Sequence, residues 1–208
     1  VATAAVANVN DVGAVTISDM TPTEDQVLTA TVVDEDGVPN NVTYQWKRGN
    51  ANIGGATAAT YTAVQADVGQ QLQVVVNYTD SLNTAENNIT SAATTAVANV
   101  NDAPTGAVTI SGTAREDETL TASNNLADED GLGVISYQWN RTSGGTTTNI
   151  GGATASTYTP VQADVGSTIT VTASYTDGQS NAHSVTSAAT NAVANVNDVG
   201  VASIAGVA

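Results

Sequence analysis

An internal repeat places the tightest constraint on what this chain can fold into. The hexapeptide Val-Ala-Asn-Val-Asn-Asp ends at Asp11, Asp102 and Asp198, so it recurs after 91 and then after 96 residues. Most features between these marks also occur twice, including Tyr-Gln-Trp at 44–46 and 137–139 and Ala-Asp-Val-Gly at 66–69 and 163–166. Solenoid repeats span roughly 20–45 residues, so a period this long predicts one autonomous domain per copy.

The repeat also sets the expected domain boundaries. The second copy is longer chiefly at 142–148, where the first copy has a short turn around Gly49 and Asn50. An insertion at a single point, with the rest in register, indicates a surface turn. We expect a piece of a longer array, with the tail of a preceding repeat over 1–11, repeats over 12–102 and 103–198, and the start of a following repeat over 199–208.

Short alternating segments separated by turn residues predict a β-sandwich in each copy. Leu72, Val74, Val76 and Tyr78 share one face of their segment, which is the two-residue period of a half-buried strand. We therefore expect an all-β fold of two tandem immunoglobulin-like (cadherin-like) sandwiches, end to end. The strands expected in the first copy lie near 14–18, 26–33, 42–47, 51–53, 60–63, 71–79 and 89–97.

The two tryptophans fall on the third predicted strand of each copy. Trp46 has the same parity as Tyr44, and Trp139 the same parity as Tyr137. An exposed platform for stacking sugars is the alternative to core packing. Core packing is favoured, because an immunoglobulin-like sandwich buries a Trp at this position and the chain has no phenylalanine or third Trp to build a platform.

The charge of the chain excludes two classes of partner. It has 20 acidic and 4 basic residues, for a formal net charge of −16, which repels nucleic acid and anionic lipid and attracts cations. Its lack of cysteine excludes disulfides and thiolate metal sites. No apolar run approaches the roughly 18 residues of a membrane span. A small secreted domain without disulfides needs another source of stability, and a bound metal is the usual one.

The predicted loops gather acidic residues where the two copies join. Strands that alternate in direction place alternate loops at the same end of a sandwich. The residues that this brings to one predicted junction, all acidic except Asn101, are Glu24, Asp25, Asp67, Asn101 with Asp102, Asp128, Glu129, Asp130 and Asp177. Like charges at about 4 Å repel by on the order of 1–4 kcal/mol, and a divalent cation would turn that repulsion into binding. The alternative is that these residues only form turns, and that Asp67 braces its own turn.

Calcium fits this set best, because Ca²⁺ takes 6–8 hard oxygen ligands. Zn²⁺ would need histidine or cysteine, and the only histidine is His183. Since the first copy has Glu86 near the position of His183, we expect this histidine to lie in a surface loop outside the repeat.

The residues Asn101-Asp102-Ala103-Pro104, Glu116 and Asp128-x-Asp130 resemble the cadherin-type calcium junction. The whole repeat more closely resembles the tandem extender domains of large bacterial RTX adhesins, over both copies. This resemblance implies Ca²⁺ between domains, bound at the central junction by Glu24, Asp25, Asp67, Asn101, Asp102, Asp128, Asp130 and Asp177. At the N-terminal junction it implies Asp11, Asp34, Asp36 and Asp80, and at the C-terminal junction Glu116, Asp117, Asp164 and Asp198.

The chain departs from the cadherin pattern at three places. The loop of Asp67 carries one acid rather than two, Asn99 replaces the first linker aspartate, and Asp11 is not followed by proline. We expect one or two ions at each junction.

The function implied is that of a calcium-rigidified spacer that projects a distal binding module from a bacterial cell surface. Its expected partners are the neighbouring repeats of the same monomeric chain, without nucleic acid, membrane contact or a small-molecule substrate. A second hypothesis is an adhesion module in which exposed threonines bind ice or a glycan. Catalysis is disfavoured, because the sequence shows no nucleophile, base and pocket in combination.

Overall fold

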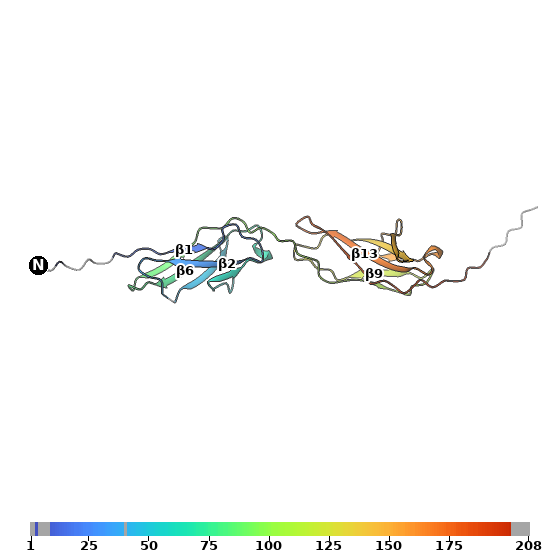
Figure 1. Cartoon of the computed structure of the whole chain (residues 1–208), viewed down its shortest axis with the longest axis horizontal. Coiled ribbons are helices and arrows are strands. Elements are labelled where there is room, and N and C mark those ends of the chain that lie inside the picture. The colour runs from blue at the N-terminus through green and yellow to red at the C-terminus, as the bar shows by residue number, and fades with distance from the viewer. Residues whose placement is uncertain (1–2, 4–8, 40, 201–208) are drawn as a thin grey trace, which may run out of the picture. The chain divides into compact units, whose positions relative to one another are not determined.

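The computed structural model describes residues 3, 9–39 and 41–200, and these fall into two compact units within Val1–Val100 and Asn101–Ala208. The described residues form strands and two short 3₁₀ helices, without an α-helix (Figure 1). No helix among them is long and apolar enough to cross a lipid bilayer.

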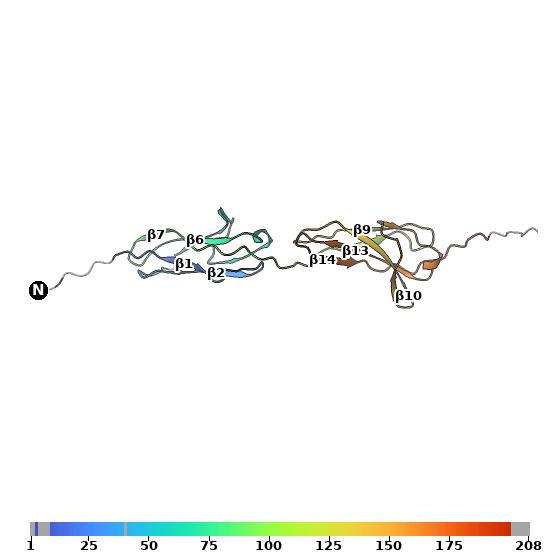
Figure 2. The same cartoon turned by 90° about the horizontal axis from the view of Figure 1, so that it is seen from above.

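Unit 1 is a sandwich of two antiparallel sheets (Figure 2). One sheet has the order β1 (Ala14–Ile17), β2 (Val27–Val33), β5 (Thr60–Thr62). The other has the order β4 (Ala51–Asn52), β3 (Thr43–Arg48), β6 (Leu72–Thr79), β7 (Ala85–Thr90). The 3₁₀ helix η1 (Gln65–Asp67) connects β5 to β6.

Unit 2 repeats this topology strand for strand. Its sheets have the orders β12 (Thr157–Tyr158), β9 (Leu120–Asn124), β8 (Val108–Ser111) and β11 (Thr146–Asn149), β10 (Ser136–Ser143), β13 (Thr168–Thr176), β14 (Ala182–Thr186), with η2 at Gln162–Asp164. The expected insertion is a longer hairpin between β10 and β11. It turns at Gly144 and Gly145, whose φ angles of 56° and 82° suit glycine. The all-β, immunoglobulin-like expectation is confirmed in both units.

The core of each unit lies between its two sheets, as the alternation of residues predicts. Leu72, Val74, Val76 and Tyr78 point inward from β6 and are buried. Trp46 is fully buried, and its indole nitrogen donates to the Ala58 carbonyl at 3.0 Å. Trp139 is equally buried in unit 2 and donates to Ala155 at 2.9 Å. Core packing of the tryptophans is therefore confirmed, and they form no exposed stacking platform.

The last strand of unit 1 begins earlier than expected. The sequence predicted a strand over 89–97, whereas β7 spans Ala85–Thr90. Asp80 and the left-handed residue Asn83 (φ 68°) make a tight turn that allows pairing to start at Ala85. After β7, the hydroxyls of Ser91 and Thr94 accept from the amides of Val74 and Leu72 in place of regular ladder bonds.

The chain then leaves unit 1 alongside the β1–β2 connection. Thr23 and Ala98 form a parallel bridge, with the Ala98 amide donating to Pro22 and the Glu24 amide donating to Ala98, both at 2.9 Å. Unit 2 has the same arrangement, with a parallel bridge between Arg115 and Ala194. In each unit the chain thus enters at one end, the N-terminal end, and leaves at the other, the C-terminal end (Figure 1).

Candidate metal centre

The acidic turn after β2 binds the chain that enters unit 1. Asp34 accepts from the amide of Asp36 at 2.8 Å through Oδ1, and from the Tyr78 hydroxyl at 2.7 Å through Oδ2. Asp36 in turn accepts from the amide of Asp11 at 2.9 Å. The structure therefore brings Asp11, Asp34 and Asp36 together at the N-terminal end of this unit.

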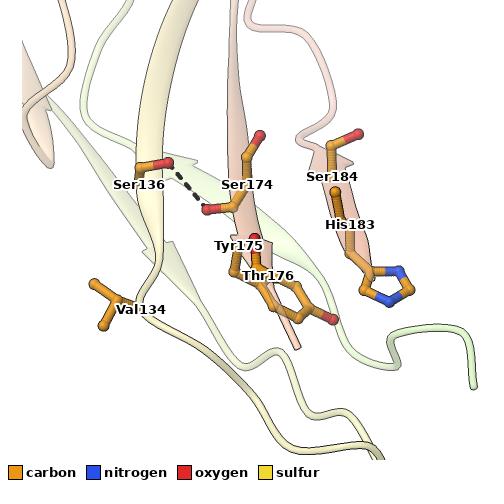
Figure 3. Close-up of a pocket in the computed structure, with 8 residues that line it drawn as sticks. Val134, Ser136, Ser174, Tyr175, Thr176, His183 and Ser184 are labelled. Carbon is orange, nitrogen blue, oxygen red and sulfur yellow. Dashed lines mark hydrogen bonds between the residues drawn. The ribbon is translucent and has the colours of Figure 1, made fainter. Parts of the chain in front are cut away.

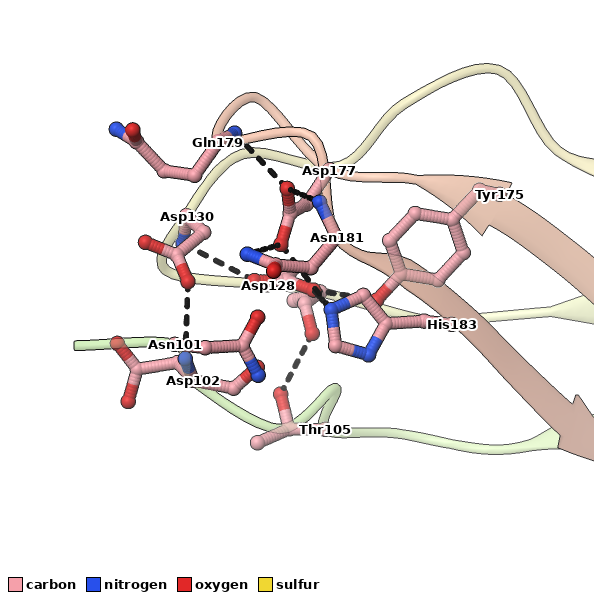
Figure 4. Close-up of polar contacts among 11 residues, drawn as sticks. Asn101, Asp102, Thr105, Asp128, Asp130, Tyr175, Asp177, Gln179, Asn181 and His183 are labelled. Atoms are coloured by element: carbon pink, nitrogen blue, oxygen red, sulfur yellow. Dashed lines mark hydrogen bonds and ion pairs between the residues drawn. The ribbon is translucent and has the colours of Figure 1, made fainter. Parts of the chain in front are cut away.

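Unit 2 repeats this network with its own residues (Figure 4). Asp128 accepts from the amide of Asp130 at 3.0 Å and from the hydroxyl of Tyr175. Asp130 accepts from the amide of Asp102 at 2.9 Å. Asn101 and Asp102 lie beside this turn, where the chain enters the unit (Figure 4). Burial and the bond to the Asp128 carboxylate raise the pKa of Tyr175 to about 12.

The turn between the last two strands contributes a second acid in each unit. Asp80 Oδ1 accepts from the amides of Leu82 and Thr84 at 2.8 and 2.7 Å. Asp177 Oδ1 accepts in the same way from Gln179 and Asn181, both at 2.8 Å. Burial alone would raise the pKa of Asp177, but its hydrogen bonds from Asn181, His183 and Gln179 outweigh burial and lower it.

Two carboxylate oxygens at these ends are buried without a hydrogen-bond partner among the described residues. They are Asp80 Oδ2 in unit 1 and Asp130 Oδ1 in unit 2, on residues that are 4% and 5% exposed. An unsatisfied buried polar group costs about 1–3 kcal/mol, and a charged one costs more. A cation bound to each oxygen would remove that cost, so the donors present fit a hard metal ion.

His183 lies inside this region rather than in a surface loop, which corrects the sequence-based expectation. It is on β14, opposite Tyr175 of β13, and its ring stacks on that tyrosine with centroids 5.3 Å apart. Its side chain is 11% exposed, with Nε2 at 3.1 Å from Asp177 Oδ2 and 3.8 Å from Asp128 Oδ2. One donor atom of each of the three residues lies within 4.8 Å of the others.

A sequence signal for His183 did exist. Glu86 of unit 1 pairs with Tyr78 as His183 pairs with Tyr175, so the two residues hold the same inward position. The difference in residue type therefore does not place the histidine outside the repeat. It is a change of chemistry at equivalent positions of the two units, and Glu86 was not among the predicted site residues.

Asp67 and Asp164, both predicted as ligands, have structural partners instead. Asp67 is fully buried, and Oδ1 accepts from Arg48 at 2.6 Å. Its Oδ2 accepts from the Tyr61 hydroxyl at 2.7 Å and from the Val64 amide at 2.9 Å. Asp164 has the equivalent contacts with Arg141, Tyr158 and Val161. Both residues brace the turn before the sixth strand, which was the alternative considered for Asp67.

The remaining predicted acids lie at the C-terminal end of each unit. Glu24 is buried, and its carboxylate lies 3.5 Å from the amide of Val100, while Glu116 accepts from Val196 at 3.1 Å. Asp25 and Asp117 are exposed and adopt left-handed turns with φ of 61°. Asp198 is exposed on the chain that leaves unit 2.

Comparison with known proteins gives distant structural likenesses only. No protein-family model and no curated protein sequence matches the chain. One similar solved structure is a Ca²⁺-stabilized adhesin that helps an Antarctic bacterium reach out and bind ice, with 14% identity and a TM-score of 0.37 over 90% of this chain. Another is a run of titin domains, with 15% identity and a TM-score of 0.32 over 89% of this chain and 68% of that one.

The chain covers 50% of the adhesin structure. At these TM-scores neither likeness bears on function. The immunoglobulin-like assignment rests on the strand order and the buried tryptophans of the two units.

Proposed function

We propose that this chain is a pair of extender repeats from a bacterial cell-surface adhesin, and that Ca²⁺ bound at the N-terminal end of each repeat stiffens the chain leading into it. The role is structural rather than enzymatic. The observation that carries the proposal is the pair of buried carboxylate oxygens, Asp80 Oδ2 and Asp130 Oδ1, that lack a partner among the described residues. The extender assignment itself rests on the resemblance of the repeat motifs.

The residues that would bind the ion differ slightly from the sequence-based set. At the N-terminal end of unit 1 they are Asp11, Asp34, Asp36 and Asp80, and at the N-terminal end of unit 2 they are Asn101, Asp102 and Asp130. All supply oxygen donors, as Ca²⁺ prefers. Glu24, Asp25, Glu116, Asp117 and Asp198 remain predicted ligands at the C-terminal ends. The proposal leaves out Asp67 and Asp164, because arginine, tyrosine and a backbone amide already bind their carboxylates.

The link between the ion and stiffness follows from the hydrogen bonds of the incoming chain. The amides of Asp11 and Asp102 are held by Asp36 and Asp130. An ion shared by these carboxylates and the incoming residues would add strong, short-range ligand bonds to the hydrogen bonds that already hold this segment. The linker then loses conformational freedom, which suits a spacer that must hold a binding module away from a cell.

Thermal unfolding with and without calcium tests the proposal. Ligand at 100 times its Kd stabilises a fold by about 2.7 kcal/mol. For domains of this size that raises Tm by on the order of 10 °C. We expect Ca²⁺ to raise Tm and EDTA to reverse the rise. A melt that saturating calcium leaves unchanged would refute calcium binding, and small-angle scattering of the same samples reports whether the chain extends.

Two variants make this test specific. Asp80→Asn keeps the oxygen that binds the turn amides but removes the unpartnered charge, so it should raise the Tm of repeat 1 without calcium and abolish its response to calcium. Glu118→Gln is the control, because it removes one negative charge from an exposed pair with Arg115 and should leave the response intact. An Asp80→Asn protein that responds to calcium like the parent would exclude Asp80 as a ligand.

A further inference from the structure

The two repeats differ by one donor atom at an otherwise shared position. Asp34 and Asp80 of repeat 1 correspond to Asp128 and Asp177 of repeat 2. The third inward residue is Glu86 in repeat 1 and His183 in repeat 2, each paired with the buried tyrosine of the neighbouring strand. Repeat 1 therefore presents only oxygen donors here, whereas repeat 2 presents two carboxylates and an imidazole.

We propose that Asp128, Asp177 and His183 form a second kind of metal site, which binds a divalent transition-metal ion of the Zn²⁺ class. In tetrahedral coordination with bonds of about 2.0–2.2 Å, neighbouring donor atoms lie roughly 3.4 Å apart. The imidazole Nε2 is 3.1 Å from one carboxylate oxygen and 3.8 Å from the other. These two distances lie on either side of the ideal value, and each of the three residues offers a donor atom within 4.8 Å of the others.

The surroundings of the three side chains hold them in place for an ion. Tyr175 donates to the Asp128 oxygen that faces His183, and the side-chain amide of Asn181 donates to Asp177 Oδ2 at 3.1 Å. Each acid is further fixed by amides of its own turn. Such outer contacts orient metal ligands in known sites. His183 Nε2 lies 3.1 Å from Asp177 Oδ2, and a bound ion would replace the hydrogen bond between these two atoms.

Of the three side chains, only that of His183 reaches solvent: it is 11% exposed, whereas those of Asp128 and Asp177 are 0% exposed. An open hollow of about 440 Å³ adjoins His183 and is also lined by Tyr175, Thr176 and Ala182, but the two aspartates do not line it (Figure 3). Three protein donors leave a fourth tetrahedral position that a water molecule can take.

The imidazole decides which ion binds. Ca²⁺ coordinates oxygen almost exclusively, whereas imidazole is a preferred ligand of Zn²⁺ and its neighbours in the transition series. In repeat 2 this assigns Asp128 and Asp177 to the transition-metal site and leaves Asp130, Asp102 and Asn101 for calcium. The zinc site does not depend on calcium binding, so each can fail without the other.

Calorimetric titration of the whole two-repeat chain with Zn²⁺ tests the inference, after EDTA treatment and in buffer with excess Ca²⁺. Co²⁺ is the spectroscopic probe, because tetrahedral Co²⁺ with mixed nitrogen and oxygen ligands absorbs visible light strongly. We expect one Zn²⁺ per chain and a tetrahedral Co²⁺ spectrum that Zn²⁺ abolishes. Absence of binding by the parent chain at a ligand concentration of about 100 μM would overturn the proposal.

Three variants locate the site. His183→Gln removes the metal-binding nitrogen but keeps a hydrogen-bonding group, and it should weaken Zn²⁺ binding by more than the roughly 100-fold seen for outer-sphere changes. His183→Glu copies repeat 1 and replaces the nitrogen by a carboxylate, which is also a Zn²⁺ ligand, so it should weaken binding by less. Glu86→Gln is the matched control at the equivalent position of repeat 1 and should leave Zn²⁺ binding unchanged. Binding that survives both His183 changes, or that is lost in Glu86→Gln, places the ion elsewhere. Calcium-dependent melting of the same proteins reports folding and the calcium sites separately.

Discussion

Replacing Asp67 by asparagine measures the structural role of a buried carboxylate that could have been mistaken for a metal ligand. The change keeps the shape of the side chain but removes its charge and one acceptor oxygen. Arg48, Tyr61 and the Val64 amide all donate to this carboxylate, at 2.6, 2.7 and 2.9 Å. An asparagine can accept on one side only, so at least one of these donors is left facing an NH₂ group.

The expected loss follows from burial. Breaking a buried ion pair costs about 3–5 kcal/mol, and a single hydrogen bond to a charged group is worth about 1.5–3 kcal/mol. The Asp67 side chain is 0% exposed, whereas that of Arg48 is 31% exposed and can regain water. We therefore expect Asp67→Asn to lower the free energy of unfolding by about 3 kcal/mol, at the lower end of this range. Glu118→Gln, in the exposed pair with Arg115, should cost less than about 1 kcal/mol.

Each unit has a single tryptophan, which allows repeat 1 to be followed alone. In a Trp139→Phe background, fluorescence reports only on the buried Trp46. With a urea dependence of about 1–3 kcal/mol/M, the loss should lower the unfolding midpoint by about 1–3 M. The same shift should appear in calcium and in EDTA. A shift below about 0.5 M, or one present only with calcium, would refute the structural role of Asp67.

Two further predictions concern repeat 2, with Trp139 fluorescence as the reporter. A Cβ on Gly133 would lie 1.9 Å from the Thr176 carbonyl oxygen, so Gly133→Ala should lower the free energy of unfolding by about 1–3 kcal/mol. Gly151→Ala is the control, because a Cβ there meets open space and should leave the free energy of unfolding unchanged. Equal effects of the two changes would contradict this prediction. The folded-state pKa of Tyr175 is about 12 against about 10 when unfolded, so its contribution to stability is complete below pH 10 and is lost as pH rises to 12. Tyr175→Phe should reduce this alkaline loss in urea titrations from pH 9 to pH 12, and an unchanged loss would count against it.

Much of the fold follows from short-range sequence patterns. The buried face of β6 could be predicted, because side chains on a strand alternate regardless of what lies opposite. Its inward residues are Leu72, Val74, Val76 and Tyr78. The place of the insertion in repeat 2 followed from the comparison of the two copies. The start of β7 was missed because a left-handed Asn83 has no strong signature of its own.

The site was harder to predict, because its chemistry depends on contacts between strands that are distant in sequence. Asp67 accepts hydrogen bonds from Arg48 of β3 and Tyr61 of β5, and the sequence of its own loop does not predict those partners. The acids in the turns after β2 and β6 were assigned to the correct end of their units because strand direction alternates. His183 was placed wrongly because a substitution within a repeat was treated as a departure from the repeat.

The bridge between the outgoing segment and the connection of the first two strands in each unit has a mechanical consequence. Residues near Thr23 run in the same direction as those near Ala98, and the two are tied by backbone bonds of 2.9 Å. Tension on the chain pulls one segment backward and the other forward, so it loads these bonds together in shear instead of peeling them apart one at a time. Rupture then requires both bonds to break at once, so the bridge opposes detachment of the outgoing segment more strongly than bonds that are peeled apart in turn.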